Sequence, residues 1–358
     1  MNYIQPFLKE LCEVSGLSGY ETPASDTIQK KWIPLVDEIQ KSNIGSLHGI
    51  KKGSMDNRDH SVLIAAHMDA IGLMITNEEN GFLSFTSIGG IDPRVLPGQP
   101  VEVHPNRSGS GSEDAIPGLI VQPSNHLLPR DLESKVVPID KLFIDTGLSP
   151  KQVKERIREG DLVSFAQKPR SLSGDTLAAH SLDNRAAVAA LTVCLEELQT
   201  KNHRWDVWPV ATVQEEVGLI GAYTSTFQIR PSLAVVVDTT WAKGPGSDDW
   251  NTYPLGEGPT LLFGPNIHPK LHQTFKELAE RLEIPTKVEI TGRHSGTDAF
   301  ATQIVAEGIP TMAVGIPIRY MHTPVEVTAI KDINRTGRLL AEFIRNLDED
   351  FLKSIELD

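Results

Sequence analysis

Four short apolar runs limit the possible folds of this chain. They cover residues 61–67, 207–214, 233–238 and 311–318, and each is dominated by apolar side chains. Runs of this length without polar alternation are typical of strands that are covered on both faces, as in parallel sheets. Such strands need helices packed on each side of the sheet, so we expect an α/β fold.

Segments with helical periodicity lie between these runs. Three apolar stripes recur at spacings of three and four, which is the period of a helix with one buried face. One stripe starts after Pro269, a residue type common at the first helical position. The stripes comprise Ala187, Leu191, Cys194, Leu195 and Leu198; Leu271, Phe275, Leu278, Ala279 and Leu282; and Ile333, Gly337, Leu340, Ile344 and Leu347. The alternation predicts a mixed, largely parallel sheet flanked by helices.

The middle of the chain has a different pattern. Short strand-like pieces are separated there by Gly, Pro and Ser, and residues 106–114 have the composition of a flexible loop. Residues 149–160 indicate a helix, with Ser149 as its cap, Pro150 at its first position and Gly160 as its end. The change of pattern predicts a β-rich module inserted into the α/β fold.

The length of the chain also favours two domains, because 358 residues are many for a single core. We expect a discontinuous α/β domain of residues 1–74 and 164–358. The inserted domain, residues 75–163, is expected to be small, β-rich and barrel-like.

Charge and cysteine content exclude several classes of protein. The formal net charge of −13 argues against a general phosphate-binding surface, so we expect no nucleic-acid partner. No apolar run approaches the ~20 residues of a membrane-spanning helix, and the N-terminus lacks the pattern of a signal peptide. We therefore expect no membrane association and a cytoplasmic enzyme. Cys12 and Cys194 sit in helical patterns and are expected to be buried thiols, so any metal would be held by His, Asp and Glu.

Ionisable residues stand at the ends of the apolar runs. The first run ends in His67 and Asp69, the second in Glu215 and Glu216, the third in Asp238, and the fourth is followed by His322. Because ligands of open α/β sheets bind beyond the carboxyl ends of the strands, we expect these side chains to lie together. Asp183 joins them as a residue at the start of a helix.

Each of these residues also has an ordinary structural explanation. Asp183 is a typical helix-start residue, and adjacent glutamates are typical of a solvated surface. Asp238 suits a turn, His67 a hydrogen-bonded core position, and His322 a loop. All of these explanations would have to hold together at one sheet edge, so we favour a functional site.

The chemistry of the set favours metal ions. Two histidines and three carboxylates suit zinc, cobalt or manganese. Five ligands are too many for one tetrahedral ion with an open position, but they suit two ions that share a bridging carboxylate, roughly 3.5–4 Å apart. Asp69 could accept the second ring N–H of His67. Of the adjacent glutamates, one would be a ligand and the other a proton acceptor for water, and the spacing leaves open which is which.

Five motifs resemble the dinuclear metallo-aminopeptidases of the tetrahedral (TET) and glutamyl aminopeptidase type. They are, in order, "AAHMDAIGLMI", "SLDNRAA", "TVQEEVGLIGA", "VVVDTT" and "IPIRYMHTPVEV", and the likeness covers nearly the whole chain. It implies that the α/β domain is catalytic, that the inserted domain serves dimerisation, and that the dimers assemble into a tetrahedral dodecamer. It also implies hydrolysis of N-terminal residues from peptides with a free N-terminus.

The resemblance implies a role for each site residue. Asp183 would bridge two divalent ions, for which zinc or cobalt is expected. Glu215 would be the general base and acid, and Asp69 would orient His67. The remaining ligands would be His67 and Asp238 at one ion, and Glu216 and His322 at the other.

Two positions depart from the family pattern. Asn184 stands where the family usually has a second aspartate, and Ala70 where it commonly has glutamate. These changes bear on metal preference and rate more than on reaction class. Arg293 would favour an acidic first residue, although an exposed loop arginine is the simpler explanation. His126 and His180 are not expected to be ligands.

Other classes of protein remain alternatives. A carboxypeptidase or deacetylase on a related dinuclear site would use similar ligands. A glycoside hydrolase would use two carboxylates but would not need the histidines. A non-catalytic protein of the same fold would be expected to lack a ligand or the base.

Overall fold

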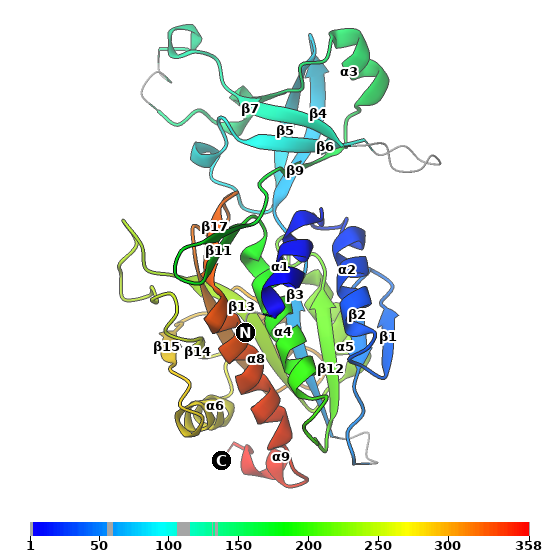
Figure 1. The fold of residues 1–358 in the computed structure, drawn as a ribbon, viewed down its shortest axis with the longest axis vertical. Coiled ribbons are helices and arrows are strands. Elements are labelled where there is room, and N and C mark those ends of the chain that lie inside the picture. Colours follow the sequence, from blue (N-terminus) through cyan, green and yellow to red (C-terminus); the bar gives the residue numbers. More distant parts are fainter. Residues whose placement is uncertain (1–2, 56–59, 106–114, 131, 133–134, 358) are drawn as a thin grey trace. The chain divides into compact units, whose positions relative to one another are not determined.

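The computed structural model describes residues 3–55, 60–105, 115–130, 132 and 135–357, and these belong to two compact units (Figure 1). The first unit comprises Met1–Asp69, Pro169–Met321 and Glu326–Asp358, and the second comprises Ala70–Lys168 and His322–Val325. The loop predicted at residues 106–114 lies outside the described residues.

An eleven-stranded mixed sheet forms the centre of the first unit. Its middle consists of four mutually parallel strands in the order β12 (Asp206–Thr212), β3 (Ser61–His67), β13 (Leu233–Trp241) and β16 (Thr311–Arg319). These strands are the four apolar runs of the sequence, and most of their residues are buried. The predicted fold class is therefore confirmed.

Strands that the sequence pattern did not reveal extend this parallel core on both sides, mostly by antiparallel pairing. Beyond β12 lie β2 (Leu47–Ile50) and β1 (Glu38–Lys41). Beyond β16 lie β17 (Glu326–Ala329), β11 (Thr176–Ala179) and β10 (Arg170–Leu172). In addition, β14 (Thr260–Phe263) pairs antiparallel with β16 and parallel with β15 (Lys287–Ile290).

Helices cover the buried strands of this sheet. In the first group, α4 (Leu182–Glu197) and α8 (Ile330–Arg345) pack against each other and against the sheet, and α1 (Ile4–Glu13) packs on α4 (Figure 1). In the second group, α5 (Ile220–Ile229) and α7 (Asp298–Gln303) pack together and on β12, β13 and β16. The remaining helices are α2 (Thr22–Trp32), α6 (Pro269–Arg281) and α9 (Phe351–Ser354). The predicted apolar stripes of α4, α6 and α8 are buried, apart from the partly covered Leu282.

The second unit is a closed antiparallel barrel. Its strands follow the order β4 (Gly72–Glu79), β5 (Phe82–Ile88), β8 (Phe143–Asp145), β7 (Ile116–Val121), β6 (Pro100–His104) and β9 (Leu162–Phe165). Short 3-10 turns occur at η1 (Pro93–Val95), η2 (Asn125–Leu127) and η3 (Ile139–Lys141). Leu73, Val101 and Ile144 are among the residues of its hydrophobic interior. The β-rich, barrel-like fold predicted for the middle of the chain is confirmed, and its role in dimerisation stays a prediction.

The helix predicted at residues 149–160 begins as expected and ends early. α3 spans Pro150–Arg156, and Ser149 caps it in a capping box with Gln152. Ile157 is already extended, and its side chain is buried in the hydrophobic interior of the barrel. Gly160, which has a φ of 88°, serves the turn that follows rather than the helix end.

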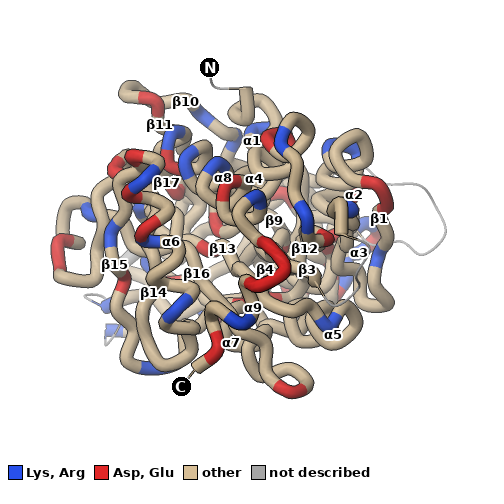
Figure 2. The backbone as a smooth tube through the Cα atoms, turned by 90° about the horizontal axis from the view of Figure 1, so that it is seen from below, with Lys and Arg blue, Asp and Glu red and all other residues tan. Residues whose placement is uncertain are grey.

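The composition bears on three features of the described residues, namely membrane-spanning helices, the distribution of charge and the two cysteines. Among them, no helix combines the length and apolar character needed to cross a bilayer. Figure 2 shows Lys and Arg interspersed with Asp and Glu along the backbone. Cys12 and Cys194 are buried free thiols, as predicted.

Candidate metal centre

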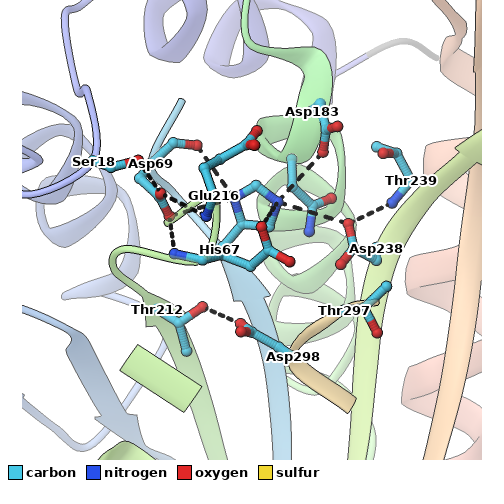
Figure 3. A network of polar contacts seen from close by, with 12 residues as sticks. Ser18, His67, Asp69, Asp183, Thr212, Glu216, Asp238, Thr239, Thr297 and Asp298 are labelled. Atoms are coloured by element: carbon cyan, nitrogen blue, oxygen red, sulfur yellow. Dashed lines mark hydrogen bonds and ion pairs between the residues drawn. The ribbon is translucent and has the colours of Figure 1, made fainter. Parts of the chain in front are cut away.

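Ionisable side chains gather at the carboxyl ends of the parallel strands of the first unit (Figure 3). His67 is the last residue of β3, and Asp238 lies in the last part of β13. Thr212, at the end of β12, is in register with His67, so the segment after it brings Glu215 to the same edge. Asp183 arrives from the first turn of α4. The topology thus places side chains from four distant segments around one point.

Three carboxylates surround one ring nitrogen of His67. Its Nε2 atom lies 3.3 Å from Asp183 Oδ1, 3.7 Å from Asp238 Oδ1 and 3.9 Å from Glu215 Oε2. A single ring proton on Nε2 cannot satisfy three acceptors. The arrangement suits a cation held between the imidazole and the carboxylates.

Two overlapping triads are compact enough to hold metal ions. One joins His67, Glu215 and Asp238, the other joins His67, Asp183 and Glu216, and the donor atoms of each lie within 4.8 Å of one another. Donor atoms bound to one ion at about 2 Å are at most about 4 Å apart, so only a small contraction is needed. Imidazole with carboxylates is a donor set for divalent transition metals. The residues present therefore fit a metal centre.

Burial makes this concentration of carboxylates costly without a cation. Burial, together with Asp238 and Asp298 nearby, raises the pKa of Glu215 to about 10. The pKa of Asp238 is also raised well above its usual value, by burial and by Asp183. Burial alone would lower the pKa of His67, but the surrounding carboxylates raise it well above its ordinary value. Each shift signals a shortage of positive charge, which divalent ions would supply.

Asp69 is fully buried and connects His67 to the glutamate pair (Figure 3). The Nδ1 atom of His67 lies 3.2 Å from the backbone oxygen of Asp69 and 3.4 Å from its Oδ1, so both groups support the ring. The carboxylate also accepts the backbone N–H groups of Glu215 at 3.0 Å and Glu216 at 3.2 Å. Burial would raise the pKa of Asp69, but His67 and the N–H and O–H donors lower it.

The two adjacent glutamates lie in a turn. β12 ends at Thr212, and Gln214 has a φ of 56°, which residues other than glycine rarely adopt. The turn closes when the backbone N–H groups of Gly218 and Leu219 bond to the backbone oxygen of Glu215. Because the chain has left the strand, the strict alternation of side chains no longer applies. Glu215 and Glu216 can therefore join different triads at one edge.

Two residues outside the predicted set of ligands and catalytic groups support the centre. Asp298, at the start of α7, is buried and accepts a hydrogen bond from Thr212 Oγ1, and burial raises its pKa to about 6. Glu326 Oε2 accepts the backbone N–H of Asp183 at 3.0 Å. The Thr297 cap before Asp298 was an available signal of a helix start, but no local signal pointed to Glu326.

Three further residues discussed from the sequence are Asn184, Arg293 and His322. Asn184 is buried and its Nδ2 donates to the backbone oxygen of Val237 at 2.9 Å, so this departure from the family pattern has a local structural role. Arg293 is exposed, and its contribution to specificity stays a prediction. His322 belongs to the second unit and lies beside Gly90. The two are so close that a Cβ atom added to Gly90 would lie 3.3 Å from Nδ1 of His322. Its role as a ligand also stays a prediction.

Comparisons with known proteins agree with this fold. The M42 glutamyl aminopeptidase family matches residues 45–339. The lysyl aminopeptidase of Pyrococcus furiosus is 34% identical over 344 residues, which cover 95% of this chain and 96% of that protein. A TET aminopeptidase from a marine sediment archaeon of the Thaumarchaeota has a TM-score of 0.91 at 27% identity, with 99% of each chain covered. The Pyrococcus horikoshii TET1 peptidase, which can assemble into a tetrahedron or a large octahedral shell, has a TM-score of 0.81 at 29% identity, covering 96% of this chain and 100% of the other. The chain therefore belongs to the M42 glutamyl aminopeptidase family and is a peptide-bond hydrolase of the aminopeptidase type.

Proposed function

We propose that this aminopeptidase uses two divalent ions, zinc or cobalt, to remove the first residue of peptides with a free N-terminus. The convergence of three carboxylates on Nε2 of His67 carries the proposal. Asp183 is the proposed bridging ligand, with His67 and Asp238 at one ion. Glu216 and His322 are assigned to the other ion, and the assignment of His322 rests on the sequence resemblance. When bound, the ions would supply Lewis acidity toward the peptide carbonyl and the attacking water.

Glu215 is the proposed proton carrier. Its backbone is held by Asp69, which leaves the carboxylate at the edge where the ligands converge. Bound cations would offset the burial and the negative surroundings that raise its pKa, so Glu215 would be ionised. It would accept a proton from water at a carboxylate oxygen and pass it to the nitrogen of the departing amine.

Glu215→Gln and Glu216→Gln are a matched pair that tests these roles. Glu215→Gln should keep its metal and lower kcat by about 10²–10⁴-fold, because the amide has the same shape but cannot accept the proton. Glu216→Gln should bind less metal, because an amide oxygen is a weaker ligand than a carboxylate. Elemental analysis and peptide hydrolysis by each purified variant measure both effects.

Glu215 also lies in a triad with His67 and Asp238, so the alternative role for Glu215 is that of a metal ligand. Equal metal loss in the two variants would make Glu215 a ligand. Parental activity in Glu215→Gln would remove it from the mechanism. The parent enzyme should also refuse an N-acetylated peptide, whereas a carboxypeptidase or deacetylase would accept it.

The proposal extends to assembly. The TET1 relative can form a tetrahedron, and the barrel unit of this chain carries exposed apolar side chains at Phe82 and Leu119. We assign a dimer contact to this surface, from which a larger closed homo-oligomer, a tetrahedral dodecamer, would be built.

A further inference from the structure

We propose that Glu21, on the segment between α1 and α2, is a positioning residue that holds the glutamate turn of the metal centre. Glu21 acts through the backbone of Gln214 rather than through the reacting atoms. The inference rests on the proposed role of Glu215, whose carboxylate the turn carries.

Glu21 is a buried carboxylate with two backbone donors. It is 6% exposed, and its Oε1 atom accepts the N–H of Gly19 at 2.6 Å and the N–H of Gln214 at 3.1 Å. The bond to Gln214 joins positions 193 residues apart in the sequence. Because burying a carboxylate is unfavourable unless its hydrogen bonds are satisfied, this contact is a specific feature of the fold.

The bond from Gln214 falls at a residue with a left-handed backbone. The φ of 56° at Gln214 is the left-handed conformation that side chains other than glycine disfavour. The next two N–H groups, those of Glu215 and Glu216, bond to Asp69. Three successive N–H groups are thus held by two buried carboxylates, Glu21 and Asp69, and Glu21 holds the one at the strained residue.

The segment that carries Glu21 is itself fixed to the centre. Ser18 donates its Oγ proton to Asp69 Oδ2 at 2.6 Å. Arg185, from the start of α4, is fully buried and donates through Nη1 to the backbone oxygens of Leu11 and Val14. The segment is therefore tied both to α4 and to the carboxylate that supports the turn, so it can serve as a rigid base.

Loss of the Glu21 carboxylate should misplace Glu215 without removing a metal ligand. Gln214 would be free to relax to a commoner φ, and rotation there moves the side chain of the next residue. A displacement of about 1 Å in a catalytic group can cost about 10²-fold in rate. Burial, assisted by Asp69 and opposed by the N–H donors, raises the pKa of Glu21 to about 7. Glutamine, which has the same shape and no charge, therefore resembles the protonated form of Glu21.

The test compares Glu21→Ala and Glu21→Gln with a matched pair, Asp332→Ala and Asp332→Asn. Asp332 is also buried and accepts two backbone N–H groups, from Gly256 and Gly258, but it lies in α8. Glu21→Ala should lower kcat by about 10–100-fold with KM within about threefold of the parent. Glu21→Gln keeps the Oε1 acceptor and should stay within about fivefold of the parental kcat. The folded Asp332 variants should keep the parental kcat whatever their stability.

Two further measurements do not depend on activity. Metal content in Glu21→Ala should equal that of the parent by elemental analysis. Hydrogen exchange of the amides of residues 214–216 should become faster in Glu21→Ala and stay parental in Glu21→Gln and in both Asp332 variants. If Glu21→Ala does not fold, Glu21→Asp replaces it with the same expected results, because the shorter side chain cannot reach Gln214.

An unchanged kcat or unchanged exchange in Glu21→Ala would overturn the proposal, and so would an equal loss of kcat in Asp332→Ala. Failure of the parent to cleave peptides would instead contradict the proposed function. The exchange measurement would still decide whether Glu21 holds the turn.

Discussion

His48 and His67 are both buried in the same sheet, yet their surroundings shift their pKa values in opposite directions. The carboxylates around His67 raise its pKa despite burial. His48, on β2, bonds through Nε2 to Ser225 Oγ at 2.9 Å, and burial lowers its pKa to about 4. His67 is therefore suited to binding cations alongside carboxylates, whereas His48 is a neutral part of the core.

His48 should make the fold sensitive to acid. Its pKa is lower in the folded chain than in the unfolded chain, where it is near 6.5. The unfolded chain therefore takes up the proton more readily, so the contribution of neutral His48 is complete above about pH 6.5 and is lost as pH falls through 4. His48→Gln does not titrate, and between pH 7 and pH 4 its free energy of unfolding should fall by up to about 3 kcal/mol less than that of the parent. Urea unfolding across this range measures the difference, and parallel pH curves for the two proteins would contradict it.

The contact between α4 and α8 depends on a residue without a side chain. A Cβ on Gly337, in α8, would lie 2.6 Å from the backbone oxygen of Ala190 and 2.5 Å from Cβ of Val193, both in α4. Helix propensity alone would favour alanine at this position by about 1 kcal/mol. The close approach outweighs propensity, because overpacking a core typically costs about 1–3 kcal/mol.

Gly337→Ala should therefore lower the free energy of unfolding by up to about 2 kcal/mol, since the two helices must move apart. Arg338→Ala, at the next and exposed position of α8, is the control and should change stability by less than about 0.5 kcal/mol. Chemical denaturation of both variants measures the effect. A stabilised Gly337→Ala would mean that α4 and α8 separate without cost.

In the whole molecule, the outer face of the barrel is the surface to which we assign the contact with a second copy of the chain. Phe82 on β5 and Leu119 on β7 are 44% and 52% exposed, and both lie opposite Asp145 of β8. Phe82, Val121 and Phe143 also line one hollow of the surface. Exposed apolar side chains on one face of a sheet are typical of interaction surfaces.

Leu119→Asp should reduce the size of the assembly, because a charge cannot be buried at an apolar contact without a partner. Mass photometry should find the parent in particles many times the 39.3 kDa of one chain, and the variant in smaller ones. Lys151→Asp, at a highly exposed position of α3 in the same unit, is the matched control and should keep the parental size. If the two variants have the same size distribution, the contact lies elsewhere.

The parts of the fold that could be predicted are those whose residues carry their own pattern. The parallel core was visible because strands covered on both faces must be apolar along their length. The barrel was visible as short strands separated by Gly and Pro. Strands β1, β10 and β15 were not predicted, since most of their residues are exposed and lack an apolar run. Their conformation depends on the neighbouring strand that supplies hydrogen bonds, which a local pattern does not contain.

The amino-acid pattern was enough to show which ionisable residues stand at the ends of the apolar runs, and hence that His67, Asp238 and the glutamate pair meet at one edge of the sheet. The way in which the pair is held depends on the packed fold. The left-handed φ of Gln214 depends on acceptors supplied by Asp69 and, across 193 positions, by Glu21. Strand ends share an edge for reasons of topology, whereas a hydrogen bond between distant segments exists only once both segments are packed.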